Sequence, residues 1–221
     1  NLSRAYNLAG NIKSSITQKI FKVEMFKMKK TPKLMAINTP SRDVLIDNLD
    51  EGMKKYFRVC EEKLGFVPNV LLSYAFRPEK LKNFVSTYNE LMLGESGLSK
   101  LEREMIAVVV SSTNHCLYCV VAHGQAVRQL SGDPELAEKI SINYRAAGLD
   151  KRNKSMLDFA YKLTKDPSII EDCDRDELRE AGFKEEDIFD IADTVAFFNM
   201  SNRIASGLDM QPNNQYHKMN R

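Results

Sequence analysis

Apolar residues recur at three- and four-residue intervals along most of the chain, which is the spacing of an amphipathic helix. Stripes of this kind occupy residues 41–64, 78–93, 150–163 and 184–208, with glycine or proline between them. No segment alternates apolar and polar residues as a half-buried strand does, and no Asn-Gly or Asp-Gly pair marks a hairpin. The pattern therefore predicts an all-α fold.

A capping box opens a further helix at residues 99–102. Ser99 is followed three positions later by Glu102, whose side chain is expected to return to the Ser99 backbone N–H. Glu104 comes next and leads into the apolar run at 105–110. From spacing alone, this carboxylate is equally consistent with a solvated first-turn residue and with a functional acid. The polar residues 111–114 then break the helix, which places Cys116 in the first turn of the following one.

The candidate chemistry lies in Cys116, Cys119 and His123. Residues three and four positions apart share one helix face. Further apolar residues continue that face, namely Val120, Val127 and Leu130. The thiols and the imidazole are therefore expected to point inward. A thiol is a strong nucleophile only as a thiolate, which a neighbouring base or a helix N-terminus favours.

Several kinds of site contain two cysteines at this spacing. A thioredoxin-like site needs a preceding strand, and none is predicted. A c-type haem needs histidine directly after the second cysteine, where this chain has Val120. A structural zinc ion needs four ligands, and only His115 or Glu104 is near enough to complete the three. Thiol redox catalysis ranks first, a zinc-binding or general thiol–disulfide module second, and inert core packing third.

Composition sets limits on the partners. With 43% hydrophobic and 28% charged residues in 221, the chain resembles an ordinary globular protein. The net charge of +2 favours no polyanionic partner. No apolar run approaches the roughly 20 residues of a membrane-spanning helix. We therefore expect neither nucleic acid nor a membrane as partner. Cys60 and Cys173 lie far from the close pair and are expected to be inert.

Residues 1–34 differ from the rest, because their many lysines and arginines face a single acid, Glu24. Basic, serine-containing and acid-poor segments are typical of targeting to a mitochondrion or plastid. We nevertheless expect a disordered basic arm, or sequence upstream of a start at Met25, Met28 or Met35, with the protein in the cytoplasm, and keep the organelle as the alternative. The expected division is an extension at 1–34, a helical domain at 35–211 and a polar tail at 212–221.

The stretch Glu104, eleven residues, Cys116-x-x-Cys119-x-x-x-His123 resembles the active-site signature of the alkylhydroperoxidase D group. That group belongs to the carboxymuconolactone decarboxylase-like superfamily. The resemblance is closest to its peroxidase-related branch and covers residues 40–211. It includes LGFVPN at 64–69, GLSKLERE at 97–104, RAAGL at 145–149, LDFA at 157–160, and VAFFN at 195–199 with NR at 202–203.

The resemblance implies an all-α homo-oligomer, trimeric or hexameric, with antioxidant peroxidase activity and no metal or other cofactor. Cys116 and Cys119 would form the redox disulfide, and Glu104 and His123 the proton relay. A hydroperoxide would be the substrate and an external dithiol the reductant. The best-studied relatives have histidine where this chain has Tyr118, which is a poor base at neutral pH.

The two thiols compete for the attacking role. Cys119 is preferred, because His123 lies one turn away and a thiol–imidazole pair favours the ionised form. Cys116, at the helix start, is the alternative. Asn199, Asn202 and Arg203 interrupt the last apolar helix, and a subunit interface, a buried polar network and the site all remain open for them.

Overall fold

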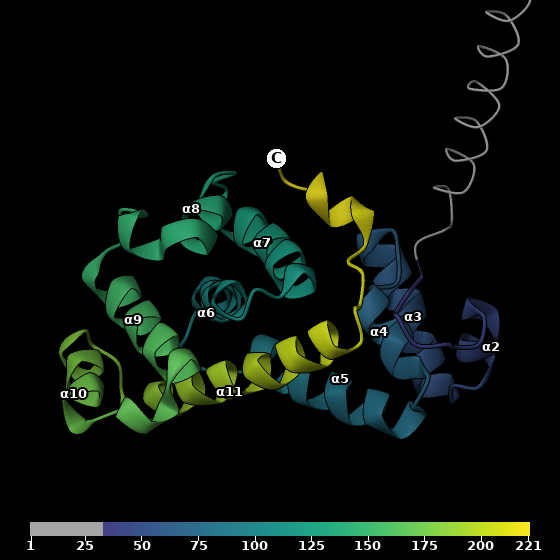
Figure 1. The fold of residues 1–221 in the computed structure, drawn as a ribbon, viewed down its shortest axis with the longest axis horizontal. Helices are drawn as coiled ribbons and strands as arrows, with labels where there is room; N and C mark the ends of the chain where they lie inside the picture. Colours follow the sequence, from purple (N-terminus) through teal and green to yellow (C-terminus); the bar gives the residue numbers. More distant parts are fainter. Residues whose placement is uncertain (1–32) are drawn as a thin grey trace, which may run out of the picture. The chain divides into compact units, whose positions relative to one another are not determined.

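Helices make up the ordered framework of the chain (Figure 1), which a computed structural model describes for residues 33–221. No strand occurs in that range, so the predicted all-α class is confirmed. Leu34–Arg221 form one compact unit. The targeting hypothesis for residues 1–34 falls almost wholly outside the described residues.

The described helices follow one another with short connections. They are α2 (Arg42–Asp47), α3 (Glu51–Leu64), α4 (Asn69–Ala75), α5 (Pro78–Leu93), α6 (Lys100–Thr113), α7 (Leu117–Ser131), α8 (Leu136–Asn143), α9 (Lys151–Lys165), α10 (Asp172–Glu180) and α11 (Glu185–Gly207), with short 3-10 turns η1 (Tyr144–Ala146), η2 (Pro167–Ile169) and η3 (Asn214–His217). The stripe at 41–64 is two helices rather than one, because Asp50 caps α3 by accepting from the Met53 N–H at 2.9 Å.

Helix α6 lies at the centre of the unit and is seen end-on in Figure 1, with α7, α8, α9 and α11 around it. The capping box is present: Ser99 Oγ accepts from the Glu102 N–H at 3.1 Å, and Glu102 accepts from the Ser99 N–H at 2.7 Å. Residues 102–111 are all buried, including Glu104. A buried carboxylate on a central helix needs a partner, since burial without one is costly.

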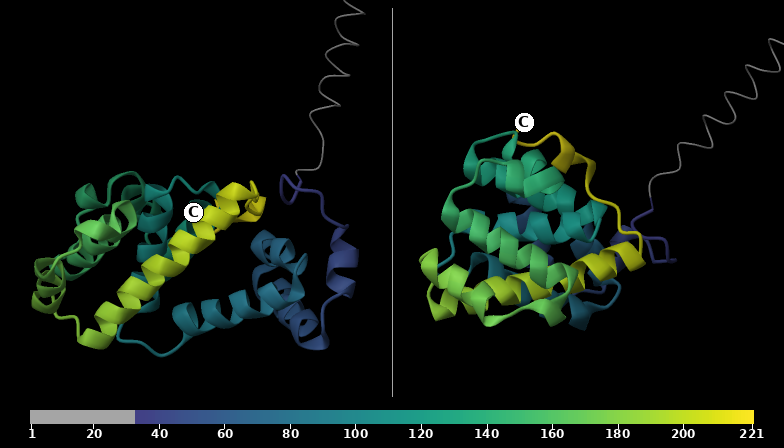
Figure 2. Two further views of the ribbon diagram at one scale, coloured as in Figure 1. Left: turned by 60° about the horizontal axis from the view of Figure 1, so that its bottom comes forward. Right: turned by 60° about the vertical axis from the view of Figure 1, so that its left-hand side comes forward.

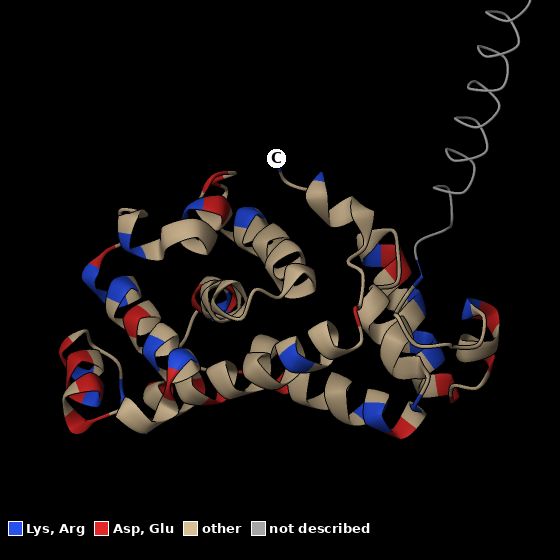
Figure 3. Cartoon of the chain, viewed as in Figure 1, with Lys and Arg blue, Asp and Glu red and all other residues tan. Residues whose placement is uncertain are grey.

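Helix α11, of 23 residues, contacts α5, α6, α7, α9 and α10 and runs along one side of the bundle in both views of Figure 2. Charged positions gather on α9 and α10, whereas α4 and α7 are largely uncharged (Figure 3). Arg128 is the only Lys, Arg, Asp or Glu of α7. The helix bearing the two cysteines therefore lies in a nearly neutral part of the bundle.

The polar segment at 212–221, expected as a tail beyond the helical domain, packs against that domain. Tyr216, in η3, is buried and its ring meets Phe66 edge-on at 5.0 Å. The buried Arg128 donates to the Tyr216 carbonyl at 2.9 Å, and Asn213 accepts from the Asn69 N–H at 2.7 Å. One aromatic ring and a few backbone contacts therefore pack a polar segment onto the helical domain.

Across residues 33–221, no helix has the length and apolar character needed to cross a membrane.

Candidate active site

The turn between α6 and α7 brings Cys116 to the start of α7. His115 takes a left-handed conformation with φ of 54°, and the Cys116 N–H donates to the Ser111 carbonyl at 2.9 Å. Cys116 is consequently the N-cap residue of α7, one position before the first turn in which we expected it. The unpaired N–H groups of a helix N-terminus favour an anion at this place.

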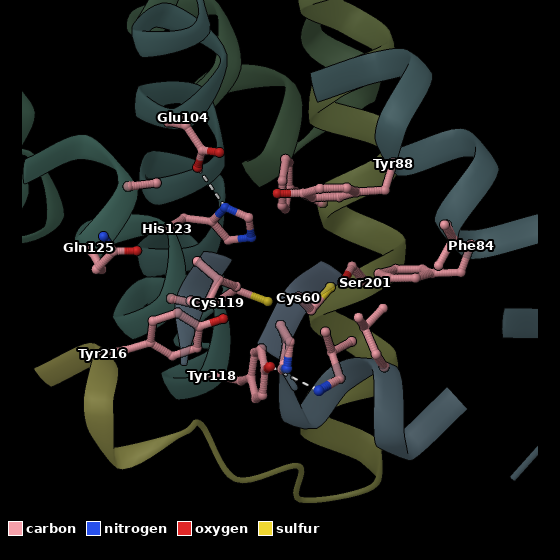
Figure 4. A pocket seen from close by; sticks show the side chains of 18 of the residues that line it. Cys60, Phe84, Tyr88, Glu104, Tyr118, Cys119, His123, Gln125, Ser201 and Tyr216 are labelled. Atoms are coloured by element: carbon pink, nitrogen blue, oxygen red, sulfur yellow. Dashed lines mark hydrogen bonds and ion pairs between the residues drawn. The ribbon is translucent and has the colours of Figure 1, made fainter. Parts of the chain in front are cut away.

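Glu104 and His123 meet between α6 and α7. His123 Nδ1 lies 2.6 Å from Glu104 Oε2, and both side chains are nearly buried. An ionised carboxylate only accepts hydrogen bonds, so Nδ1–H donates and Nε2 of a neutral ring is free to accept a proton. The ring edge also packs on Phe198, with 4.6 Å between the two ring centroids. In Figure 4 the imidazole lies between the Glu104 carboxylate and the Cys119 side chain.

The two thiols have opposite acidities. Both are free and buried. The hydrogen bond from the Cys119 thiol, together with the Cys119 backbone N–H and the Ser206 side chain, lowers the pKa of Cys116 to about 6. The same hydrogen bond, together with burial, raises the pKa of Cys119 well above its usual value. The lowered pKa therefore belongs to Cys116, the alternative that its place at the helix start had offered, and not to the thiol one turn from His123.

A cavity of about 340 Å³ opens beside this pair. Glu104, Cys119 and His123 lie along its wall, while Cys116 does not. Much of the remaining wall is aromatic and comes from α3, α5, α11 and η3, with Tyr56, Phe84, Tyr88, Phe197, Phe198 and Tyr216 (Figure 4). A molecule in this cavity would reach Cys119 and not Cys116.

Cys116 is covered on its other side by an irregular segment, residues 34–36. Met35 is 2% exposed and packs in one apolar cluster with Cys116, Ala205 and Met210. The Ala36 N–H donates to the Leu208 carbonyl at 2.8 Å and fixes this segment to the end of α11. Cys116 is thus the more acidic thiol, whereas Cys119 is the thiol that lines the cavity.

Asparagines of α11 hold the turn that precedes Cys116. Asn114 Nδ2 donates to the side-chain oxygens of Asn199 and Asn202, at 3.0 Å each. Asn202 Nδ2 in turn donates to Ser111 Oγ at 3.0 Å, and Asn202 is 1% exposed. Of the roles left open for these residues, the described contacts show a buried polar network that ties α11 to the α6–α7 turn.

Tyr118 has a structural contact rather than one with the relay. Its hydroxyl oxygen accepts from the Val70 N–H of α4 at 2.9 Å, and the side chain is buried. Burial raises the pKa of Tyr118 well above its ordinary value, so the phenol stays protonated. It lines the cavity without facing the Glu104–His123 contact (Figure 4).

Sequence reasoning missed one residue of the cavity wall and misjudged the exposure of one residue of α7. Cys60, expected to be inert, is half-buried and lines the cavity from α3. Burial raises the pKa of this thiol, which keeps it neutral. Its place four residues after Tyr56 in one apolar stripe was the available signal. Leu130, expected to point inward, is 45% exposed because α7 ends at Ser131, beyond the core.

The zinc alternative finds no ligand set in the described part of the chain. No group of three or more His, Cys, Asp or Glu residues within 33–221 is arranged to hold a metal ion.

Comparison with known proteins decides the family. The carboxymuconolactone decarboxylase family matches residues 78–142. An uncharacterized peroxidase-related protein from Silicibacter sp. TM1040 is 56% identical, and the match covers 87% of this chain and 100% of that one, with a TM-score of 0.82. This chain belongs to the alkylhydroperoxidase AhpD-like, carboxymuconolactone decarboxylase-like superfamily.

Another peroxidase-related member of the superfamily, described as an alkylhydroperoxidase AhpD core, comes from Ralstonia eutropha JMP134. It is 39% identical over 86% of this chain and 97% of that one, with a TM-score of 0.81. Sestrin-1 of Macaca fascicularis is 23% identical over 129 residues, which are 58% of this chain and 26% of that protein. The chain therefore spans about a quarter of the length of this curated relative.

Proposed function

We propose that this superfamily member is a thiol-dependent peroxidase that reduces hydroperoxides at the Cys116–Cys119 pair. The observation that carries the proposal is the order carboxylate, imidazole, thiol along one wall of an apolar cavity: Glu104, His123 and Cys119. Two relatives that cover most of the chain are described as peroxidase-related, which supports the same chemistry.

Oxidation begins at Cys119, because this thiol lines the cavity. His123 Nε2 takes the Cys119 proton, and Glu104 stabilises the imidazolium that forms. The thiolate sulfur attacks the terminal peroxide oxygen, the O–O bond breaks, and the leaving alkoxide takes the proton from His123. The products are an alcohol and a sulfenic acid on Cys119.

Cys116 completes the cycle as the resolving thiol. Its lowered pKa, about 6, keeps it a thiolate at neutral pH. That thiolate attacks the Cys119 sulfur, a disulfide forms, and hydroxide leaves to become water after gaining a proton. Two thiols have then reduced one hydroperoxide to one alcohol and one water. An external dithiol restores the pair by two thiol–disulfide exchanges.

Thiol titration tests the proposal. One equivalent of cumene hydroperoxide added to the reduced protein should yield one equivalent of cumyl alcohol and remove two titratable thiols per chain. Cys60 and Cys173 should stay free. Cys119→Ser should consume no peroxide, whereas Cys116→Ser should still form the alcohol and leave a dimedone-reactive sulfenic acid. Unchanged thiols and no alcohol would refute the proposal, and one tightly bound zinc per chain would favour the metal-binding alternative.

We also propose a symmetric homo-oligomer, trimeric or hexameric, from the resemblance of the signature and its flanking blocks. Light scattering at micromolar concentration should give three or six times the 25.2 kDa of one chain. A mass equal to one chain would refute this assembly.

A further inference from the structure

The wall of the active-site cavity is continuous aromatic surface from its far side to the catalytic imidazole. Phe84 stacks on Phe197 with 5.6 Å between ring centroids, and Phe197 meets Phe198 edge-on at 5.3 Å. Phe198 in turn packs on His123 at 4.6 Å. Tyr88 belongs to the same aromatic cluster: its ring centroid lies 6.2 Å from those of Phe84 and Phe197 and 6.4 Å from the imidazole (Figure 4). An apolar ring placed here would contact aromatic faces within reach of Cys119.

The cavity contains no positive group that is permanently charged. Among its lining residues, all within the described part of the chain, there is no Lys or Arg, and Glu104 is the only acid. Burial raises the pKa of Tyr56, Tyr88 and Tyr216, so these hydroxyls are neutral donors. The Glu104 carboxylate is already engaged by His123.

We infer that the cavity selects uncharged organic hydroperoxides with a ring-sized apolar body and rejects those that bear a carboxylate. This inference rests on the proposed peroxidase function and names its substrate class. A carboxylate in the cavity would lose its hydration without gaining a cation, and would lie near the Glu104 carboxylate.

Size favours the same class. The cavity volume of about 340 Å³ lies at the lower end of the range found for pockets that bind small organic ligands. Hydrogen peroxide is too small to contact much of the aromatic wall, whereas the cavity has room for a phenyl ring and its substituents. In an apolar pocket, each added carbon group improves kcat/KM by about tenfold or more.

A matched set of substrates tests the inference on the intact protein. The set is cumene hydroperoxide, its para-carboxylate derivative, the methyl ester of that derivative, tert-butyl hydroperoxide and hydrogen peroxide. In stopped-flow oxidation of the reduced protein, the ester should react at least about 100-fold faster than the acid. Cumene hydroperoxide should react at least about tenfold faster than tert-butyl hydroperoxide, with hydrogen peroxide slower still.

A change of charge at a residue that lines the cavity tests whether the discrimination against the carboxylate arises in the cavity. Gln129 is an exposed lining residue whose Oε1 accepts from Gln125 Nε2 at 2.9 Å. Gln129→Lys should raise the ratio of acid to ester rates by several-fold, and the matched variant Gln129→Glu should lower it. Glu has the same length and shape as Gln, so Gln129→Glu changes the charge alone, and Gln129→Lys tests the opposite sign.

The outcomes separate the two proposals. Equal rates for the acid and its ester, or an acid-to-ester ratio that does not respond to Gln129→Lys and Gln129→Glu, would overturn the selection while leaving the peroxidase intact. A preference for hydrogen peroxide over cumene hydroperoxide would overturn the size argument. If no member of the set oxidises Cys119, the proposed function itself fails.

Discussion

Replacing Glu104 by Gln removes the charge beside His123 and preserves the shape of the side chain. The carboxylate lies 2.6 Å from Nδ1. In the Glu104→Gln variant the side-chain carbonyl oxygen can still accept the Nδ1–H, so the ring keeps its tautomer. What is lost is the stabilisation of the imidazolium when His123 takes the thiol proton.

The magnitude follows from the burial of this contact. The side chains are only 13% and 10% exposed for His123 and Glu104, so solvent screens the interaction weakly. A hydrogen bond to a charged group contributes about 1.5–3 kcal/mol, and about 1.4 kcal/mol corresponds to a factor of ten. Glu104→Gln should therefore slow peroxide reduction at pH 7 by about 10- to 150-fold. His123→Ala, which removes the base itself, should cost at least about 100-fold.

The assay is single-turnover stopped-flow oxidation of the reduced protein by cumene hydroperoxide. Glu102→Gln is the matched control: Glu102 is equally buried on the same helix, but it contacts Arg152 at 2.8 Å and the Ser99 cap instead of His123. The Glu102→Gln variant should have a lower free energy of unfolding and an unchanged rate of peroxide reduction. A wild-type rate in folded Glu104→Gln, or an equal loss in Glu102→Gln, would refute the relay.

Four further predictions concern the two thiols and the residues around them. The ultraviolet absorbance of the thiolate should titrate with a midpoint near the Cys116 pKa of about 6, and Cys119→Ala should move this midpoint upward, because the Cys119 thiol is the main donor. Because this pKa lies below the ordinary 9.0, ionised Cys116 contributes to the free energy of unfolding, fully above pH 9 and no longer below about pH 6. Chemical denaturation at a series of pH values should show the contribution of Cys116 lost as the pH falls through about 6. Tyr118→Phe should lower the free energy of unfolding in urea by about 1–3 kcal/mol, because the Val70 N–H loses its acceptor, with little change in rate; a large rate loss would return Tyr118 to the relay. Asn202→Ala should also lower the free energy of unfolding by about 1–3 kcal/mol, and it should slow formation of the disulfide. An unchanged free energy of unfolding together with an unchanged rate of disulfide formation would contradict the role of the polar network.

The fold could be predicted well from local patterns. The capping box at Ser99 and Glu102 and the long stripe at 184–208 correspond to the start of α6 and to α11 (Glu185–Gly207). These features depend on residues within a few positions of one another. Local patterns did not predict the packing of the C-terminal segment, because Tyr216 is buried by residues distant in the sequence, Phe66 among them.

The site could be predicted in part. Helical spacing put His123 near Cys119, but it left Glu104 undecided, because its partner depends on how α6 docks on α7. The helix start offered an acidic Cys116 only as the alternative, because the sequence could not decide between the two thiols. The acidity of Cys116 depends on which thiol donates to the other and on Ser206, which lies at the far end of α11.

Because one thiol is acidic and the other lines the cavity, each has a distinct role in the proposed cycle. A thiolate facing the cavity at rest would put a second negative charge near Glu104 and draw water into an apolar space. With the charge held at the N-cap by Cys116, the cavity wall stays neutral at Cys119 until His123 takes its proton. Once Cys119 is a sulfenic acid, Cys116 still lies at the N-cap of α7, where the helix N-terminus favours its thiolate as the attacking group. The resolving step then needs no further base, which fits a site with only one imidazole among its lining residues.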